Sequence, residues 1–477
     1  MRVLLIYPNA KKEIIAWGDM GAIAEPIALE YIGAGAGLDG HEVKLLDLRL
    51  HIEDLEHTLR ELKPDVVGVT GYSMHVLRNL EVCKIVKQLV PDCRTVVGGH
   101  HATLEPVDFM EPQIDYVVIG EGVGPFRQIL ALLERDEPVQ NVAGVWARVN
   151  GGFVYGGDTR PFDINTIPPP DRTLALNDRD SYFIDWMKPI ALMRTTVGCP
   201  YRCTFCSLWR IMEGRYYKRD IEAVVDELKS IPERYVFLVD DEPFVDPRRM
   251  KALADAIEQA DVDKEYFAYC RIDTLLKDLE LMKQWKRLGL RRLLFGIETV
   301  FDHELEDYNK RYHRQQIVQG LKAARDIGIS VFCNFIINPN YTEKHFTELV
   351  NFIRQNEVDY PSFTILTPIP GTGTTYDEIL DLQPNGRPNW DYFDLQHAVT
   401  PTTLQKERFM ELYNSLYHIF SLSYLKCESP LTVQGFKERS AELSETYIQL
   451  ATRVLGQRST APTADQTTLN RPSKPRE

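Results

Sequence analysis

Three cysteines with C-x3-C-x2-C spacing stand in the segment VGCPYRCTFCSLW, at Cys199, Cys203 and Cys206. Three thiolates on one short loop suit a [4Fe-4S] cluster in which one iron keeps an open position for a further ligand. The aromatic neighbours of these cysteines, Phe205 among them, could shield such a cluster from water.

Two other uses of this cysteine group are weaker. Structural zinc takes four Cys or His ligands, and the next candidates, Cys270 and His303, are far along the chain. A redox pair made by the last two cysteines would leave Cys199 without a role. The spacing therefore favours the cluster, with zinc kept as an alternative.

The cysteine loop follows the first of six strand-like apolar runs that alternate with helical stretches. The runs cover residues 191–198, 235–241, 266–272, 293–299, 331–337 and 363–371. Six β/α units in series predict a barrel or partial barrel, in which chemistry belongs at the carboxyl ends of the strands. The polar residues at those ends are Asp240, Asp241, Arg271, Glu298 and Asn334.

An earlier alternation fills the first part of the chain. Its strand-like runs cover residues 2–8, 42–48, 65–71, 94–99 and 115–122. Continuous Val, Ile and Leu runs predict parallel strands buried on both faces, and hence a doubly wound α/β domain. The ligand of such a domain lies beyond the carboxyl ends of its strands.

Three short segments stand at those ends and carry small or polar residues. The candidates for ligand binding are Thr70, Tyr72, Ser73, Gly98, Gly99, His100, Gly120, Glu121 and Gly122. Glycines let a large flat ligand approach the backbone closely.

We therefore expect an α/β protein: a doubly wound, Rossmann-like domain, a partial (β/α)6 barrel and a C-terminal helical region. The predicted limits are 1–140 for the first domain, 141–187 for a linker, 188–385 for the barrel, 386–455 for the helical region and 456–477 for a disordered tail.

Composition excludes several classes of function. The 477 residues are 44% hydrophobic and 26% charged, as in soluble globular proteins. The net charge of -14 and the lack of a basic stripe argue against nucleic acid as a partner. No apolar run is long enough to span a bilayer. We expect a cytoplasmic enzyme with reduced thiols; the aromatic stretch 404–425 suits either packing on the barrel or contact with a membrane surface.

The cysteine motif, with Phe205 before its last cysteine and a partial barrel around it, resembles the radical S-adenosylmethionine (SAM) superfamily. The resemblance implies that the three cysteines hold the cluster and that the open iron binds SAM, which is cleaved reductively to a 5′-deoxyadenosyl radical.

Other segments extend the resemblance. LLFGIET is similar to the family's fourth-strand segment, which assigns Glu298 to the SAM ribose. Asp240 and Asp241 stand where the family's second strand usually ends in Glu, a departure from the pattern. The fifth- and sixth-strand segments, including Asn334, look like those near the adenine.

The first domain resembles that of the cobalamin-binding subclass through the segments 40–48, 65–73, 96–106 and 115–122. The Asp-x-His-x-x-Gly motif, which ligates cobalt in many cobalamin proteins, is missing. A histidine ligand from that motif is therefore not expected, and His75, His100 and His101 are the nearby polar candidates.

Within this subclass the chain most resembles the hopanoid C-3 methylases and the anaerobic magnesium-protoporphyrin ester cyclases. The resemblance implies methyl transfer to an unactivated carbon, with a small-molecule or lipid substrate and a reducing partner such as flavodoxin or ferredoxin. A cyclase or ring-rearranging enzyme without methyl transfer, and a non-catalytic cobalamin or metal sensor, remain alternatives.

Overall fold

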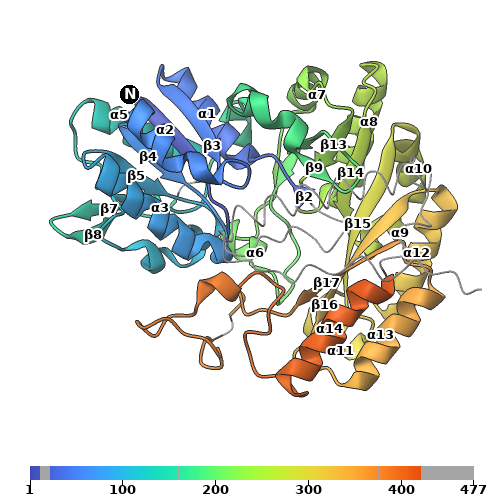
Figure 1. Ribbon diagram of the computed structural model, residues 1–477. Helices are drawn as coiled ribbons and strands as arrows, with labels where there is room; N and C mark the ends of the chain where they lie inside the picture. The colour runs from blue at the N-terminus through green and yellow to red at the C-terminus, as the bar shows by residue number, and fades with distance from the viewer. Residues whose placement is uncertain (11–21, 160, 374, 421–477) are drawn as a thin grey trace, which may run out of the picture.

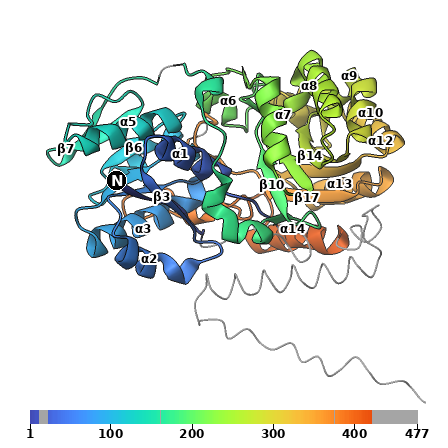
Figure 2. The same cartoon turned by 90° about the horizontal axis from the view of Figure 1, so that it is seen from above.

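The computed structural model describes residues 1–477 except for 11–21, 160, 374 and 421–477. Two sheets lie side by side, each covered by helices (Figures 1 and 2). The predicted disordered tail, 456–477, lies outside the described residues.

The first sheet has seven strands in the order β3-β1-β4-β5-β6-β7-β8. Its parallel part consists of β1 (Arg2–Tyr7), β3 (Glu42–Asp47), β4 (Val66–Val69), β5 (Arg94–Val97) and β6 (Tyr116–Val118). Apolar clusters fill both faces. This confirms the doubly wound arrangement, because strands buried on both sides need apolar residues throughout.

Helices cover both faces of this sheet. Those of this half are α1 (Ile27–Leu38), α2 (Leu55–Leu62), α3 (Val76–Leu89), α4 (His100–Leu104) and α5 (Val123–Glu134). The core on one face includes residues of α1 and α5, and the core on the other includes residues of α2 and α3.

The predicted linker 141–187 is wrong in its first part. β7 (Val145–Val149) and β8 (Gly152–Tyr155) form an antiparallel hairpin that extends the first sheet beyond β6. The reason is that Val145 and Ala147 are fully buried, so this hairpin contributes to the core of the first half.

The second sheet has six parallel strands in sequence order, with β10 and β17 at its two edges. They are β10 (Ile190–Met193), β13 (Tyr235–Leu238), β14 (Glu265–Cys270), β15 (Leu290–Glu298), β16 (Ser330–Ile337) and β17 (Tyr360–Ile365). An open run of six such strands is the partial barrel expected from the sequence.

Helices follow the strands on the outer side. They are α7 (Ile221–Ser230), α8 (Pro247–Gln259), α9 (Ile272–Lys277), α10 (Leu279–Arg287), α11 (Asp302–Asp307), α12 (Arg314–Ile327) and α13 (Glu343–Gln355). In β16, Val331, Cys333 and Phe335 join the core shared with these helices, whereas Phe332 and Asn334 keep partial exposure on the opposite face. This alternation defines an inner face, the lumen of the partial barrel.

Short elements connect the two halves. β2 (Ala22–Ile23) pairs with β9 (Phe183–Ile184), so the chain before α1 joins the segment that leads into the barrel. β11 (Thr196–Val197) pairs with β12 (Tyr217–Lys218), and these strands enclose the cysteine loop and α6 (Leu208–Ile211).

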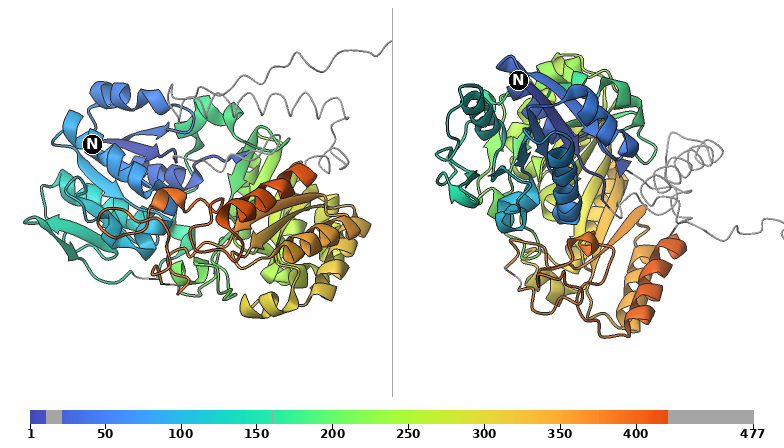
Figure 3. Two further views of the ribbon diagram at one scale, coloured as in Figure 1. Left: turned by 60° about the horizontal axis from the view of Figure 1, so that its bottom comes forward. Right: turned by 60° about the vertical axis from the view of Figure 1, so that its left-hand side comes forward.

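The region predicted as helical, 386–455, begins as irregular chain. Trp390, Phe393 and Val399 pack into a core of the first half, and Arg387 forms an ion pair with Asp108 at 2.6 Å. Burial of these large apolar side chains is favourable, and the core of the first half provides the apolar surface on which they pack. Figure 3 shows this orange segment reaching the blue half.

The helix α14 (Lys406–Phe420) is the described part of the aromatic stretch 404–425. Phe409, Tyr413 and Leu416 are buried in the core shared with the barrel. This face of α14 therefore packs on the barrel. Among the described residues, no helix is both long and apolar enough to cross a membrane.

Candidate cofactor site between the two sheets

The cysteine loop has a defined backbone geometry. The N–H of Cys206 donates to the carbonyl of Cys203 at 3.2 Å, which closes a tight turn between the last two cysteines. The indole Nε1 of Trp209 donates to the same carbonyl at 3.2 Å. Cys203 is 8% exposed, and Cys199 and Cys206 are half-buried.

A glycine is required where this loop begins. Gly198 has a φ of +94°, and a Cβ there would collide with the carbonyl oxygen of Arg215. The left-handed backbone turns the chain out of β11 towards the cysteines.

The two adjacent aspartates after β13 support this loop in different ways. Asp240 accepts from the N–H groups of Thr195 and Thr196 at 2.6 and 2.7 Å, so both of its carboxylate oxygens serve the backbone or the Thr195 hydroxyl. Asp241 accepts from the N–H of Gly198 at 2.9 Å and also lines a cavity. Asp240 therefore positions the backbone before the cysteine loop, and the cofactor contacts predicted for Asp240 and Asp241 stay predictions.

Glu242 is a candidate that the sequence analysis missed. It is 2% exposed, burial raises its pKa to about 8, and among the described residues its Oε1 has no hydrogen-bond partner. Arg271 and Cys199 lie within its electrostatic reach. The signal was available, because the family's second strand usually ends in Glu and Glu242 directly follows the two aspartates.

Arg271 joins the cysteines to the fourth strand. Its Nη1 donates to the sulfur of Cys203 at 3.8 Å, and its guanidinium carbon lies 3.8 Å from the ring centroid of Tyr201. Its Nη2 donates to the backbone carbonyl of Lys310. The Lys310 ammonium in turn lies 3.0 Å from Oε1 of Glu298, so the structure brings together the predicted residues Arg271, Cys203 and Glu298.

The donor set at this site fits an iron–sulfur cluster. Burial raises the pKa of Cys199 to about 12 and that of Cys206 to about 11, so both are thiols until metal displaces their protons. In the described part of the chain, no three His, Cys, Asp or Glu side chains already converge on one metal position. A [4Fe-4S] cubane does not require three ligands to converge on one point, because each cysteine thiolate binds a different iron of the cluster.

Phe205 and Asn334 come from different elements. The Phe205 ring lies 5.2 Å from that of Tyr308 in an edge-on arrangement and 5.6 Å from the ammonium of Lys310. Asn334 lies in the lumen on β16, next to Gly296 of β15 in the sheet register. Their predicted cofactor contacts stay predictions.

A large cavity lies where the carboxyl ends of the first sheet face the cysteine loop. It encloses about 1500 Å³ of empty space, including the part open to solvent. Of the predicted ligand-binding residues, its walls include Thr70, Gly98, Gly99, His100, Gly120, Glu121, Gly122 and Asp241. Leu208, Ile211 and Met212 of the α6 region form part of the wall on the barrel side. The glycines on its walls let a large flat cofactor approach the backbone closely, which fits cobalamin.

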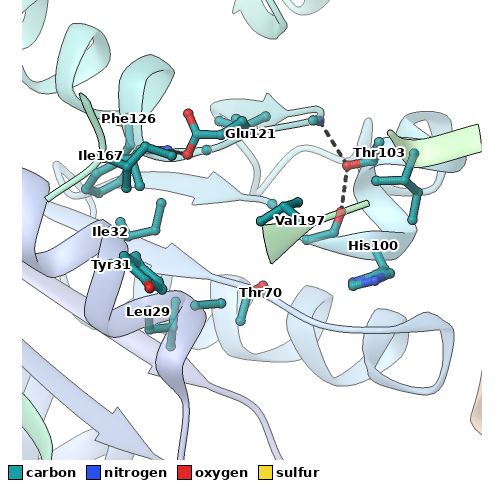
Figure 4. Close-up of a pocket in the computed structure, with 18 of the residues that line it drawn as sticks. Leu29, Tyr31, Ile32, Thr70, His100, Thr103, Glu121, Phe126, Ile167 and Val197 are labelled. Carbon is teal, nitrogen blue, oxygen red and sulfur yellow. Dashed lines mark hydrogen bonds between the residues drawn. The ribbon is translucent and has the colours of Figure 1, made fainter. Parts of the chain in front are cut away.

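Thr103 ties two of the glycine loops together, as Figure 4 shows. The N–H of Gly120 donates to the Thr103 hydroxyl at 3.0 Å, and that hydroxyl donates to the carbonyl of Gly99 at 2.9 Å. Glu121 accepts from the N–H of Val123 at 2.6 Å and so stabilises the start of α5. Thr103 was not among the predicted residues, because nothing in its sequence context separates it from other loop threonines.

The three nearby histidines have different environments. His101 uses both ring nitrogens, with the Ser73 hydroxyl and the Asp108 carboxylate each at 2.9 Å. His75 accepts from the N–H of Tyr72 at 3.1 Å. His100 lines the cavity, and burial, reinforced by Arg194, lowers its pKa to about 4, which keeps its imidazole neutral at pH 7.

Tyr72 and Ser73, which were also predicted to bind the ligand, are not among the described residues that line the cavity. The Tyr72 ring lies 4.7 Å from that of His100 and is half exposed. Ser73 is buried and its hydroxyl lies 2.9 Å from Nδ1 of His101; its predicted ligand contact stays a prediction.

Comparison with known proteins agrees with this geometry. Residues 193–353 match the Radical SAM superfamily, and residues 15–130 match the B12 binding domain. The hopanoid C-3 methylase of Methylococcus capsulatus is 31% identical over 419 residues, which cover 86% of this chain and 78% of that protein. The anaerobic magnesium-protoporphyrin IX monomethyl ester cyclase of Rubrivivax gelatinosus is 26% identical and is covered over 68% of its length.

A solved structure shares the whole architecture. It is that of the radical SAM methyltransferase TsrM from Kitasatospora setae with cobalamin and a [4Fe-4S] cluster bound, with a TM-score of 0.67 and 17% identity, covering 94% of this chain and 99% of that one. The chain therefore belongs to the cobalamin-binding branch of the radical SAM superfamily: it is a radical SAM methyltransferase whose cofactors are a [4Fe-4S] cluster, SAM and cobalamin.

Proposed function

We propose that the protein transfers a methyl group to an unactivated carbon of a hopanoid-type polycyclic lipid. The observation that carries the substrate class is the 31% identity to a hopanoid C-3 methylase over 86% of this chain. That similarity spans both halves of the protein and therefore includes the surfaces between which a substrate must lie.

The residue assignments follow from the cysteine loop and from the glycine-lined cavity described above. In this proposal Cys199, Cys203 and Cys206 hold the cluster, and Glu298 holds SAM beside it. Leu208 follows Cys206 closely in the chain and lines the large cavity, so the cobalamin cavity begins directly next to the cysteine loop. When bound, the cofactors supply a carbon radical on the substrate and the methyl group that it receives.

The chain's own contribution is placement and exclusion of water. The short cysteine loop and the glycine-lined walls set the distance between the two cofactor sites. Arg271 contacts the sulfur of Cys203 and Lys310 contacts the carboxylate of Glu298, so these two cations hold the proposed cofactor-binding side chains in place.

The lumen chemistry supports an apolar substrate. The partly exposed inner side chains of β14 to β17 include aromatic, aliphatic and neutral polar groups: Tyr269, Leu294, Phe332, Asn334 and Ser362. A polycyclic hydrocarbon gains from contact with such rings, at about 25 cal/mol per Å² of apolar surface removed from water. Because the substrate class is a lipid, we propose that the enzyme works in contact with a membrane surface.

The test is anaerobic reconstitution with iron, sulfide and cobalamin, followed by incubation with a hopanoid, methyl-deuterated SAM and a one-electron reductant such as dithionite. A product heavier by one methylene group and carrying three deuterium atoms supports the proposal. An unlabelled product from magnesium-protoporphyrin ester would favour the cyclase alternative, for which the 26% identity to the Rubrivivax enzyme is the argument. A cluster that forms without any SAM cleavage would favour a sensor.

A further inference from the structure

A small hollow lies on the surface beside the cysteine loop. It is lined by Arg202, Trp209, Arg210, Glu213 and Gly214. Arg202 lies between the first two cysteines, and Arg210 lies on α6. Both arginines are exposed.

The two arginines flank one indole. The guanidinium carbon of Arg210 lies 4.2 Å from the ring centroid of Trp209, and that of Arg202 lies 5.9 Å from it. Among the described residues neither arginine has a carboxylate partner, whereas Glu213 pairs with Arg215 at 2.8 Å. Two unneutralised cations therefore stand together on a chain with 69 acidic and 55 basic residues.

This surface is directly connected to the cluster loop. Trp209 donates its Nε1–H to the carbonyl of Cys203 at 3.2 Å. The other side of the same short helix carries Leu208 and Ile211, which line the cobalamin cavity. The α6 segment thus separates the surface hollow from the cavity, and Figures 1 and 2 show it between the two halves.

Both cofactors of this enzyme class need single electrons: the cluster before SAM is cleaved, and the cobalt before it accepts a methyl cation. We infer that Arg202, Trp209 and Arg210 form the docking surface for a small acidic one-electron carrier protein that serves both cofactors. Complementary charge steers such a carrier to the patch and orients it. The inference rests on the proposed assignment of the cluster to the cysteine loop.

The electron balance is simple. One electron leaves the reduced carrier and enters the cluster, which changes from the 2+ to the 1+ state; in a separate encounter one electron reduces Co(II) to Co(I). No bond forms or breaks in these steps, and no proton is required. The carrier is left oxidised by one electron each time.

The experiment compares Arg210→Glu with Arg287→Glu, a control with the same charge change at the exposed end of α10. Stopped-flow absorbance follows reduction of the reconstituted cluster and of bound cob(II)alamin by reduced flavodoxin, an acidic carrier. We expect Arg210→Glu to slow both reductions by about tenfold or more at low salt and the control to leave them unchanged. The difference should shrink as salt screens the charges.

A parallel measurement with dithionite, which needs no docking surface, should give wild-type rates and wild-type cluster absorbance for Arg210→Glu. Equal slowing by both variants would overturn the docking site, and slowing of the cluster alone would overturn the shared route to cobalt. If Arg210→Glu instead weakens binding to anionic phospholipid vesicles while flavodoxin rates stay normal, the surface faces a membrane and the inference is wrong. A wild-type protein that forms no cluster would refute the cysteine assignment itself.

Discussion

The ammonium of Lys310 lies 3.0 Å from Oε1 of Glu298, and the two side chains are 3% and 6% exposed. Glu298 ends β15 with a φ of +67°, a backbone conformation that non-glycine residues rarely adopt and that costs about 1–3 kcal/mol. A Cβ at Gly296 would collide with the Glu298 carboxylate, so the Gly-x-Glu spacing makes room for the pair. The backbone carbonyl of Lys310 accepts from Arg271, which contacts Cys203, so this buried ion pair connects the fourth strand to the cysteine loop.

Breaking this pair should destabilise the fold. Lys310→Met leaves a buried carboxylate without its partner, and we expect a loss of about 3–5 kcal/mol in the free energy of unfolding. The double variant Glu298→Gln/Lys310→Met should recover a large part of that loss, because no buried charge remains. Urea unfolding measures both; equal losses in the single and double variants would mean that the pair contributes packing rather than charge.

Loss of a motif cysteine should abolish binding of the cluster but not binding of cobalamin. We expect Cys203→Ala to abolish the cluster absorbance and SAM cleavage, measured as 5′-deoxyadenosine, while cobalamin binding remains. The reason is that Cys203 lies in the cysteine loop and is absent from the walls of the cobalamin cavity. Cys333→Ala is the matched control, because Cys333 is buried on the helix side of β16. Simultaneous loss of cluster and cobalamin in Cys203→Ala would show that the loop is structural.

A methyl group added at Gly98 should weaken cobalamin binding without unfolding the protein. Gly98 lines the cavity, and the nearest protein atom to an added Cβ is 3.8 Å away, an ordinary contact. The methyl therefore fills ligand space, and we expect Gly98→Ala to cost about 1–3 kcal/mol of cobalamin binding. Gly37→Ala, where a Cβ meets nothing within 4 Å, serves as control in the same titration. Unchanged affinity in Gly98→Ala would place the corrin elsewhere.

Glu30 should make stability fall as pH rises. It is fully buried, and its burial and the nearby Glu25 carboxylate together raise its pKa to about 9. The charged groups that act on it are the carboxylates of Glu25 and Asp171, which raise this pKa, and the guanidinium groups of Arg172 and Arg179, which lower it. Between its ordinary pKa and about 9, the folded protein holds one more proton than the unfolded chain. Each pH unit in that window therefore costs up to about 1.4 kcal/mol.

The matching variant is Glu30→Gln, which keeps the shape and removes the titration. Unfolding curves from pH 5 to 9 should show a smaller decline of stability for Glu30→Gln than for wild type. Parallel pH profiles of the two proteins would mean that Glu30 is not the group responsible.

The sequence by itself determined the two α/β units and the chemistry of the cysteine loop. Both rest on local patterns: continuous apolar runs specify buried parallel strands, and the C-x3-C-x2-C spacing places three cysteines on one short loop. The order of the β/α units also predicted the rim on which Arg271 and Glu298 lie, because parallel strands end at one edge.

Only the tertiary structure decided contacts between residues distant in the chain. It showed that the Asp240 carboxylate is used by the backbone after β10, that Glu242 is buried within reach of Cys199 and Arg271, and that His101 has both nitrogens engaged. It also showed that the 145–155 hairpin belongs to the first sheet and that the segment around Trp390 packs on the first half. These outcomes depend on which partner each polar or apolar group finds across the fold, and no local spacing along the chain encodes that choice.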